Sequence, residues 1–153
     1  MKYVFALCVL LFSLPSEAEE LVGPARVVDG DTLMFGDRKV HLYGVDAPEL
    51  AQTCKTRKGS DMQCGELARQ ALGYLVRGVQ VRCESRDKTP ANEMIGVCHV
   101  GWLNINEEIA LEGWAIATRD ITEDYVRAET FAKARKEGIW KTEFIPPWEW
   151  RNP

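Results

Sequence analysis

Short strand-like runs, interrupted once by a helical pattern, constrain the fold of this chain more than any other feature. Between the second and third runs lie Gly36 and Asp37, a pair suited to a two-residue hairpin turn. Apolar residues at helical spacing then occupy residues 65–78, and Gly78 suits the end of that helix. Two further strand-like runs and two helical segments follow. The predicted strands cover residues 25–28, 32–35, 39–45, 79–83 and 94–100.

Capping residues mark the two later helices. Asn104, with Glu107 three residues on, resembles a capping box, and this helix is expected to end near Gly113. Thr122 is the expected cap of the last helix, which has a basic final turn and ends at Gly138. One helix inserted after the third of five short strands favours a small barrel. We therefore predict an α+β fold, an OB-type five-stranded Greek-key β-barrel with three helices.

Two segments lack a regular pattern. Residues 50–63 are expected to form a polar loop, and residues 144–150 an extended strap that packs on the body. No internal repeat separates the chain into parts, and a length of 153 residues suits one domain.

The first 18 residues have the pattern of an export signal. A short basic start precedes an apolar run over residues 3–14, which Pro15 ends and which is too short to cross a bilayer as a mature helix. Small residues up to Ala18 suit a signal peptidase. The sequence predicts a signal peptide over residues 1–18 and a mature domain over residues 19–153. A buried N-terminal helix is the alternative. The expected location is secreted or periplasmic, with no membrane attachment after cleavage.

Four cysteines remain after that cleavage. An even set in an oxidising compartment forms disulfides by default, and three pairings are open to four cysteines. Local spacing favours Cys54 with Cys64 and Cys83 with Cys98. Each bond would contribute about 2–4 kcal/mol. A zinc site is the competing interpretation, but the spacings contain no C-x-x-C pair.

The net charge of the chain bears on whether it can bind nucleic acid. The formal charge is −4, whereas proteins that bind nucleic acid without sequence preference usually carry a basic surface. This charge argues against tight binding to nucleic acid, although a small basic cleft on an acidic body would satisfy both conditions.

Two acidic clusters flank the predicted hairpin. Asp29 and Asp31 precede its first strand, and Asp46 and Glu49 follow its second. Each cluster alone is ordinary turn chemistry. Together they offer the oxygen ligands that hard cations such as calcium prefer. In a straight hairpin Asp31 and Asp46 would lie about 13 Å apart along the strand, so a shared site requires a bend, for which Gly44 is suited.

The strings at residues 28–32 and 40–49 resemble the signature of the staphylococcal nuclease family. Residues 106–115 and 128–140 are also similar to it, and the ending at residues 146–151 resembles an exported bacterial branch. The resemblance covers nearly all of the mature chain. It implies an OB-type barrel with three helices that cleaves phosphodiester bonds in DNA and RNA with one calcium ion.

The resemblance also implies roles for single residues. Asp31 and Asp46 match the carboxylates that bind the metal, and Ala47 matches the residue whose backbone carbonyl faces it. Glu49 matches the general base that activates the attacking water. A metal stabilises charge on the phosphate, and a carboxylate within reach of a water removes its proton.

Both phosphate-binding arginines of the family are replaced. The first position, five residues before Asp46, holds His41. The second holds Glu93 in an ungapped alignment, and an aromatic position holds Thr118. One lost charge stabiliser typically costs about 10²–10³ in rate, and an arginine at a phosphoryl transition state is worth about 10³–10⁵.

Three nearby cations, Arg86, Lys88 and Arg119, are candidates to replace the lost charge. The sequence predicts an exported thermonuclease-like protein, a calcium-dependent phosphodiesterase scaffold with a weak calcium site and weak or lost nuclease activity. The alternative is a non-catalytic OB-fold binding protein of the cell envelope, and a disulfide-stapled structural protein is a third hypothesis. The expected partner is weakly bound nucleic acid or an unknown envelope partner, and the expected state is a monomer.

Overall fold

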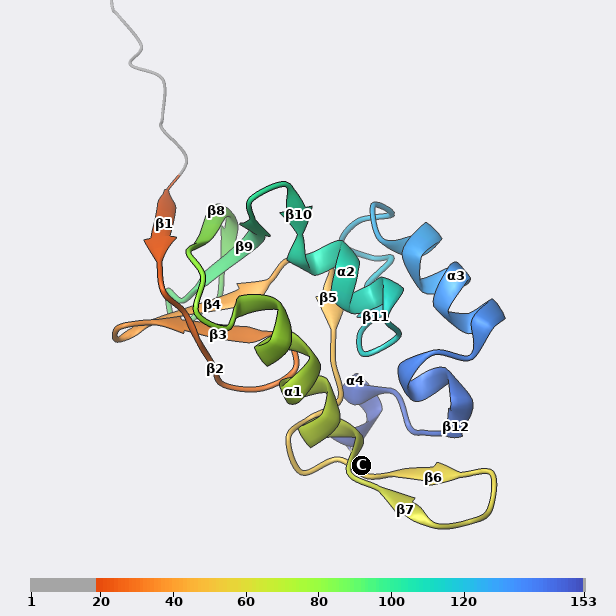
Figure 1. The fold of residues 1–153 in the computed structure, drawn as a ribbon. Helices are drawn as coiled ribbons and strands as arrows, with labels where there is room; N and C mark the ends of the chain where they lie inside the picture. Colours follow the sequence, from red (N-terminus) through yellow and green to blue (C-terminus); the bar gives the residue numbers. More distant parts are fainter. Residues whose placement is uncertain (1–18, 153) are drawn as a thin grey trace, which may run out of the picture.

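A computed structural model describes residues 19–152, so the predicted signal peptide lies outside the described residues. The main sheet is strongly curled and has the strand order β1-β8-β9-β4-β3-β2, with β10 paired to β9 (Figure 1). β4 and β9 run parallel, and the other neighbours are antiparallel. The strands are β1 (Glu20–Gly23), β2 (Arg26–Val27), β3 (Thr32–Phe35), β4 (Arg38–Leu42), β8 (Val81–Lys88), β9 (Met94–Val100) and β10 (Leu103–Asn104).

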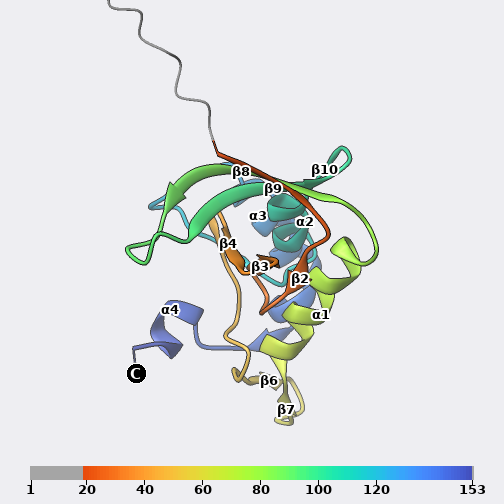
Figure 2. The same ribbon diagram turned by 90° about the vertical axis from the view of Figure 1, so that its left-hand side faces the viewer.

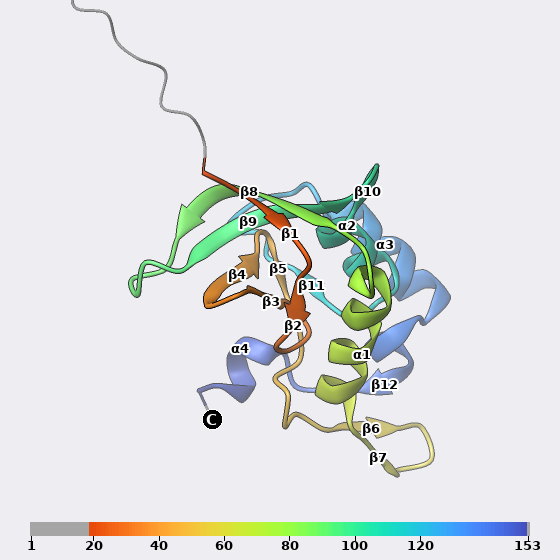
Figure 3. The ribbon, with the colours of Figure 1, turned by 60° about the vertical axis from the view of Figure 1, so that its left-hand side comes forward.

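The predicted OB-type α+β class is confirmed. All five predicted strands are present, and β1 and β10 extend the sheet beyond them. β8 and β9 arch over the shorter strands, as Figure 2 shows, and the curl is clearest in Figure 3. Among residues 19–152, no helix is both long enough and apolar enough to cross a membrane.

Three main helices enclose the core, as predicted. They are α1 (Cys64–Val76), α2 (Ile105–Leu111) and α3 (Val126–Arg135). α1 packs against β2 and α2, and α2 also packs against α3 and β9. Leu33 of β3, Leu72 of α1 and Ile109 of α2 are completely buried together in this core. The helices therefore fill the inside of the curled sheet.

The predicted hairpin has the predicted register. Thr32 pairs with His41, and this pairing continues to the turn at residues 36–37. Beyond β4 the backbone bends at Gly44, which has a φ of 76°. A β-carbon at this position would lie 2.5 Å from the side chain of Thr122, so both conformation and space require glycine. After the bend, β5 (Val45–Asp46) leaves the main sheet and pairs with β11 (Ile116–Ala117).

Both predicted disulfides are present. Cys54–Cys64 joins a small hairpin to the first residue of α1. Cys83–Cys98 joins directly paired residues of β8 and β9 inside the main core. All four cysteines are buried, so each bond lies in a packed region and not on a surface loop.

The polar loop predicted at residues 50–63 contains a hairpin instead. β6 (Cys54–Thr56) pairs with β7 (Asp61–Met62) and with β12 (Thr142–Glu143). An ion pair between Lys55 and Asp61, at 2.5 Å, crosses this hairpin. The prediction missed it because the strands are only two or three residues long, and partners distant in sequence support them.

Two predicted boundaries in the C-terminal part were wrong. Thr122 does not cap the last helix; its hydroxyl accepts a hydrogen bond from the Asp124 amide within a turn, and α3 begins at Val126. After α3 comes a short 3-10 helix, η1 (Gly138–Lys141). The tail is not an extended strap throughout, because α4 (Pro147–Trp150) forms one helical turn with proline at its start. The Asn104 cap is confirmed, since its side chain accepts from the Glu107 amide.

Candidate active site

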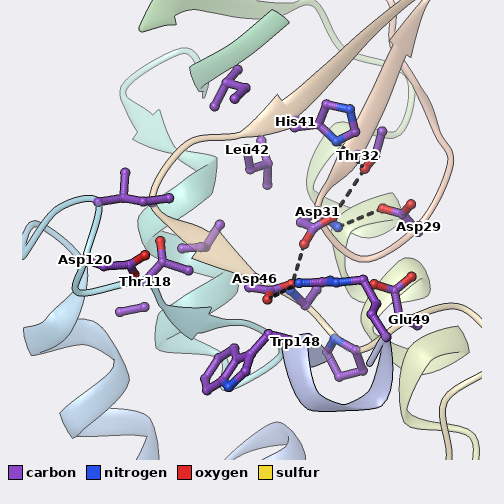
Figure 4. Close-up of a pocket in the computed structure, with 18 of the residues that line it drawn as sticks. Asp29, Asp31, Thr32, His41, Leu42, Asp46, Glu49, Thr118, Asp120 and Trp148 are labelled. Atoms are coloured by element: carbon purple, nitrogen blue, oxygen red, sulfur yellow. Dashed lines mark hydrogen bonds and ion pairs between the residues drawn. The ribbon is translucent and has the colours of Figure 1, made fainter. Parts of the chain in front are cut away.

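A pocket of about 860 Å³ opens where the Gly44 bend separates β4 from β5. The loop after β11 and the C-terminal α4 complete its walls (Figure 4). Five carboxylates and two guanidinium groups line it, which gives an acidic interior. The charged lining residues are Asp29, Asp31, Asp46, Glu49, Asp120, Arg119 and Arg151.

Asp31 lies at the centre of the carboxylate group. Its Oδ2 accepts a hydrogen bond from the Ala47 amide at 2.7 Å, and its Oδ1 accepts one from the Thr32 hydroxyl at 3.2 Å. Burial raises the pKa of Asp31 well above its usual value, and the negative charges of Asp29 and Asp46 raise it further. A positive charge placed here would stabilise the ionised form.

The bend at Gly44 brings Asp46 beside Asp31, as the predicted shared site requires. Figure 4 shows Asp46 and Glu49 on one side of Asp31, with His41 and Thr32 on the other. The Ala47 amide that contacts Asp31 follows Asp46 directly in the chain. The structure therefore unites the two acidic clusters that flank the hairpin.

Arg151 is the residue that sequence reasoning missed. Its Nη1 donates to Asp46 Oδ1 at 3.0 Å and to Glu49 Oε1 at 2.6 Å, and its Nη2 donates to Asp46 Oδ2 at 2.8 Å. These bonds, those to Asp46 first, raise the pKa of the guanidinium. One C-terminal cation thus holds two of the carboxylates to which the resemblance assigns metal and water chemistry.

The backbone after Glu49 is fixed by close packing. The Glu49 amide donates to Gln52 Oε1 at 3.1 Å, and the Gln52 amide donates back to the Glu49 carbonyl at 2.7 Å. Gly65, near the start of α1, touches the same loop: a β-carbon there would lie 1.8 Å from the Glu49 carbonyl oxygen. Gln52 is completely buried, and its Nε2 donates to the Ile145 carbonyl at 2.6 Å. The Glu49 loop is therefore tied both to α1 and to the chain that leads into α4.

The two positions of the replaced arginines meet each other. His41 Nε2 lies 2.8 Å from Glu93 Oε2, and Lys39 Nζ lies 3.1 Å from Glu93 Oε1. The other ring nitrogen of His41, Nδ1, lies 3.2 Å from the Thr32 hydroxyl. The hydrogen bond with His41, followed by that with Lys39, lowers the pKa of Glu93. Opposite charges satisfy each other here, and Glu93 does not line the pocket.

The three cations suggested as replacements are engaged elsewhere or lie outside the pocket. Arg119 lines the pocket, but it pairs with the completely buried Glu129. Lys88 pairs with Glu19 at 3.0 Å. Neither Lys88 nor Arg86 is among the lining residues. Thr118, at the expected aromatic position, does line the pocket.

The fold agrees with a match to a known protein family. Residues 39–142 match the family described as staphylococcal nuclease homologue. The chain belongs to the staphylococcal nuclease family. This match spans the second hairpin strand, the bend, all three main helices and the beginning of β12.

Three known proteins show what this chain is similar to. The succinoglycan biosynthesis protein ExoI of Rhizobium meliloti is 32% identical over 130 residues, which cover 82% of this chain and 68% of that protein. Protein ParB of Escherichia coli is 29% identical over 99% of this chain and 90% of its own length. An uncharacterised endonuclease of Haemophilus influenzae is 29% identical over 99% of this chain and 85% of its own.

The acidic residues of this family member do not form a dense metal cluster. Among residues 19–152, no three His, Cys, Asp or Glu side chains are close enough to share an ion. The nearest arrangement consists of the carboxylates of Asp31 and Asp46, which are oxygen ligands of the kind that calcium prefers, with the Ala47 amide bonded to Asp31. The guanidinium of Arg151 already provides a positive charge against Asp46.

Only one signal in the sequence pointed to Arg151. The resemblance of the tail at residues 146–151 to exported relatives included this arginine. No periodicity links it to Asp46, which lies 105 residues earlier. The contact depends on α4 turning back across the pocket, and the tail was expected to be extended.

Proposed function

We propose that this protein is an exported, calcium-dependent phosphodiesterase of low activity on DNA or RNA. The observation that carries this proposal is a contrast between the carboxylates of the pocket and the His41–Glu93 pair at its edge. The carboxylates that the family resemblance assigns to metal and base lie together around Asp31, while the two arginine positions hold a His41–Glu93 pair. Membership of a nuclease family and the endonuclease relative support the reaction class.

The residues around Asp31 fit a calcium ion. Asp31 is partly buried beside two other carboxylates, and this crowding is relieved by a cation. Asp46 and the Ala47 carbonyl would complete the protein ligands. A bound calcium would supply charge stabilisation to the phosphate in the transition state. Binding is expected to be weak, in the range of about 10⁻⁴–10⁻³ M seen for extracellular sites.

Glu49 is the proposed general base. Its side chain is 37% exposed at the pocket, while its backbone is held by Gln52 and Gly65. A fixed backbone with a reachable carboxylate suits proton removal from a water. In this structure Oε1 of Glu49 accepts a hydrogen bond from Arg151, so only Oε2 is open to a water while Arg151 stays in place.

The proposed low activity follows from the charges that a phosphate would meet in the pocket. A phosphate that enters the pocket meets five carboxylates, and Arg119 is engaged by Glu129. His41 is held by Glu93 instead of facing the substrate alone. Losing one preorganised donor costs about 10²–10³ in rate, and such losses are rarely additive. Nucleic acid should therefore bind weakly and be cleaved slowly.

A non-catalytic binding protein of the envelope is the second candidate. It is favoured by the acidic pocket, which repels a polyanion, and by the Arg151 contacts that occupy Asp46 and Glu49. The two buried disulfides support a location in an oxidising compartment under either proposal.

Digestion of single-stranded DNA and RNA by the purified protein tests the proposal. We expect slow cleavage that requires calcium and that disappears on chelation. The Glu49→Gln variant should lose this cleavage while keeping its thermal stability. Cleavage that survives Glu49→Gln would contradict the assigned base. A complete absence of cleavage at saturating calcium would favour the binding protein.

A further inference from the structure

The C-terminal segment is hydrogen-bonded to the pocket through one side chain, and Trp148 also lines the pocket. Among the described residues, every hydrogen bond from residues 148–152 to the rest of the chain comes from Arg151. The other hydrogen bonds of this segment stay within residues 146–152. Trp148 and Trp150 are 42% and 36% exposed. Since α4 has only four residues, its position depends strongly on Arg151.

Ahead of α4 the chain is anchored firmly. Pro147 is buried, and Gln52 donates to the Ile145 carbonyl. The anchor lies on the same loop as Glu49. The segment after Pro147 can therefore open without loss of the core, because the buried contacts end at this proline.

Arg151 occupies both oxygens of Asp46. Its Nη1 bonds to Oδ1 of Asp46 and its Nη2 to Oδ2, and Nη1 also bonds to Glu49. Any cation that binds directly to Asp46 must share one of these oxygens with Arg151 or displace Arg151 from it. Two positive charges at one carboxylate also repel each other at this short range. Occupancy by a metal ion and closure by Arg151 therefore oppose each other.

We propose that Arg151 is an internal latch that competes with a divalent cation for Asp46 and releases residues 148–152 when the cation binds. This inference rests on the calcium site of the proposed function. In the closed state Arg151 lowers the apparent affinity for calcium and donates a hydrogen bond to Oε1 of Glu49. Calcium binding opens the latch, and both oxygens of Glu49 become available to a water. Linkage requires the two effects to be reciprocal: the latch weakens calcium binding by the factor by which calcium weakens the latch.

Calorimetric calcium titration tests the latch without relying on cleavage. We compare the wild type with Arg151→Gln, which keeps a similar length but lacks the charge. Arg135→Gln is the matched control, because Arg135 is also exposed and also pairs with a carboxylate, that of Glu137. The dissociation constant for calcium should fall about fivefold or more in Arg151→Gln, as for a typical coupling between sites. It should not change in Arg135→Gln.

Amide hydrogen exchange provides the second readout. In the wild type, the amides of Trp150 and Arg151 bond within the α4 turn, and we expect calcium to reduce their protection. In Arg151→Gln their protection should already be low without calcium. The folded core, followed at Leu72 and Ile109, should stay protected in every case.

The outcomes separate the latch from the proposed function. Equal calcium affinity in the wild type and Arg151→Gln, or α4 protection that calcium leaves unchanged, overturns the latch even if the protein cleaves nucleic acid. Tighter calcium binding in Arg151→Gln without any cleavage supports the latch and contradicts the proposed function. Failure of both proteins to bind calcium at about 10 mM, roughly ten times the expected range, overturns both.

Discussion

Asp31 in the pocket and Glu93 just outside its lining have pKa values shifted in opposite directions. On the carboxylate side, Asp31 has a raised pKa because burial and neighbouring negative charges disfavour its ionised form. On the strand side, Glu93 has a lowered pKa because His41 and Lys39 pair with it. Unsatisfied charge marks a place that gains from a ligand, whereas a paired charge stabilises the protein itself. The difference agrees with the proposal that a cation, and not an anion, binds beside Asp31.

The test with the largest expected effect restores arginine at the two positions where the family has phosphate-binding arginines. His41→Arg combined with Glu93→Arg should raise calcium-dependent cleavage by at least about 10², because a preorganised guanidinium stabilises the phosphoryl transition state. The structure adds a condition to this expectation. His41→Arg alone should gain little, because Glu93 would pair with the new arginine as it does with His41.

The measurement is the initial rate on single-stranded DNA at one salt concentration, since binding depends on salt. Glu49→Gln in the doubly substituted protein is the control and should remove the gain. A double variant that folds and binds calcium but cleaves no faster would show that the two sides differ for reasons beyond positions 41 and 93.

One disulfide lies beside the Glu49 loop and the other in the main core, and the next test separates their effects. Cys54→Ala with Cys64→Ala should lower the free energy of unfolding by about 2–3 kcal/mol, and Cys83→Ala with Cys98→Ala by about 3 kcal/mol. Only the first pair should also weaken calcium binding, because Cys64 precedes Gly65, which packs on the Glu49 loop. Denaturant unfolding and calorimetry measure the two effects. Equal loss of calcium affinity in both variants would mean that the two regions are mechanically coupled.

Asp31→Asn should stabilise the protein. The pKa of Asp31 is higher in the folded state than in the unfolded chain, so the folded state binds its proton more tightly. The wild type therefore loses stability as pH rises from about 3.9 through the raised folded value, and the variant lacks this loss. At pH 7 we expect a gain of about 0.5–2 kcal/mol, the usual range for a stabilising substitution.

Thermal unfolding between pH 4 and pH 8, without calcium, checks this expectation. The difference between variant and wild type should grow with pH and then level off. A variant that is less stable at pH 7 would show that the bonds from Ala47 and Thr32 to this carboxylate outweigh its crowding.

Glu93→Gln should have the smallest effect and the opposite pH dependence. The lowered pKa of Glu93 means that its ionised form stabilises the fold above the unfolded pKa, and that this contribution is lost as pH falls through the folded value. The variant should be slightly less stable than the wild type at neutral pH and equal to it in acid. The same thermal series measures it. A difference that persists in acid would show that the side chain acts by packing instead of charge.

Local rules predicted the frame of the pocket well. The hairpin register and the bend follow from Gly36, Asp37 and Gly44, because turn chemistry and positive φ act on neighbouring residues. The Asn104 cap is of the same local kind. Cysteine spacing also sufficed for both disulfides, since each partner lies within 15 residues.

Long-range contacts explain what was missed. The β6–β7 hairpin depends on β12, and Arg151 meets Asp46 across 105 residues. Neither leaves a periodic trace in the sequence. The start of α3 was misplaced because Thr122 has the chemistry of a cap but bonds within a turn. The assigned chemical roles of Asp31, Asp46 and Glu49 stay predictions, which the variants above are designed to test.

The packing around Gly65 restricts which residues can stand at this position. Any side chain at this position would place a carbon 1.8 Å from the Glu49 carbonyl oxygen and 2.6 Å from its carbonyl carbon. Both atoms belong to the backbone, so a change of rotamer elsewhere cannot make room. In a saturation library, position 65 should therefore accept glycine alone, while the adjacent exposed faces of α1 accept many residues. A variant without the Glu49 carboxylate should keep the same requirement for glycine at position 65, because the clash is with backbone atoms and not with the side chain.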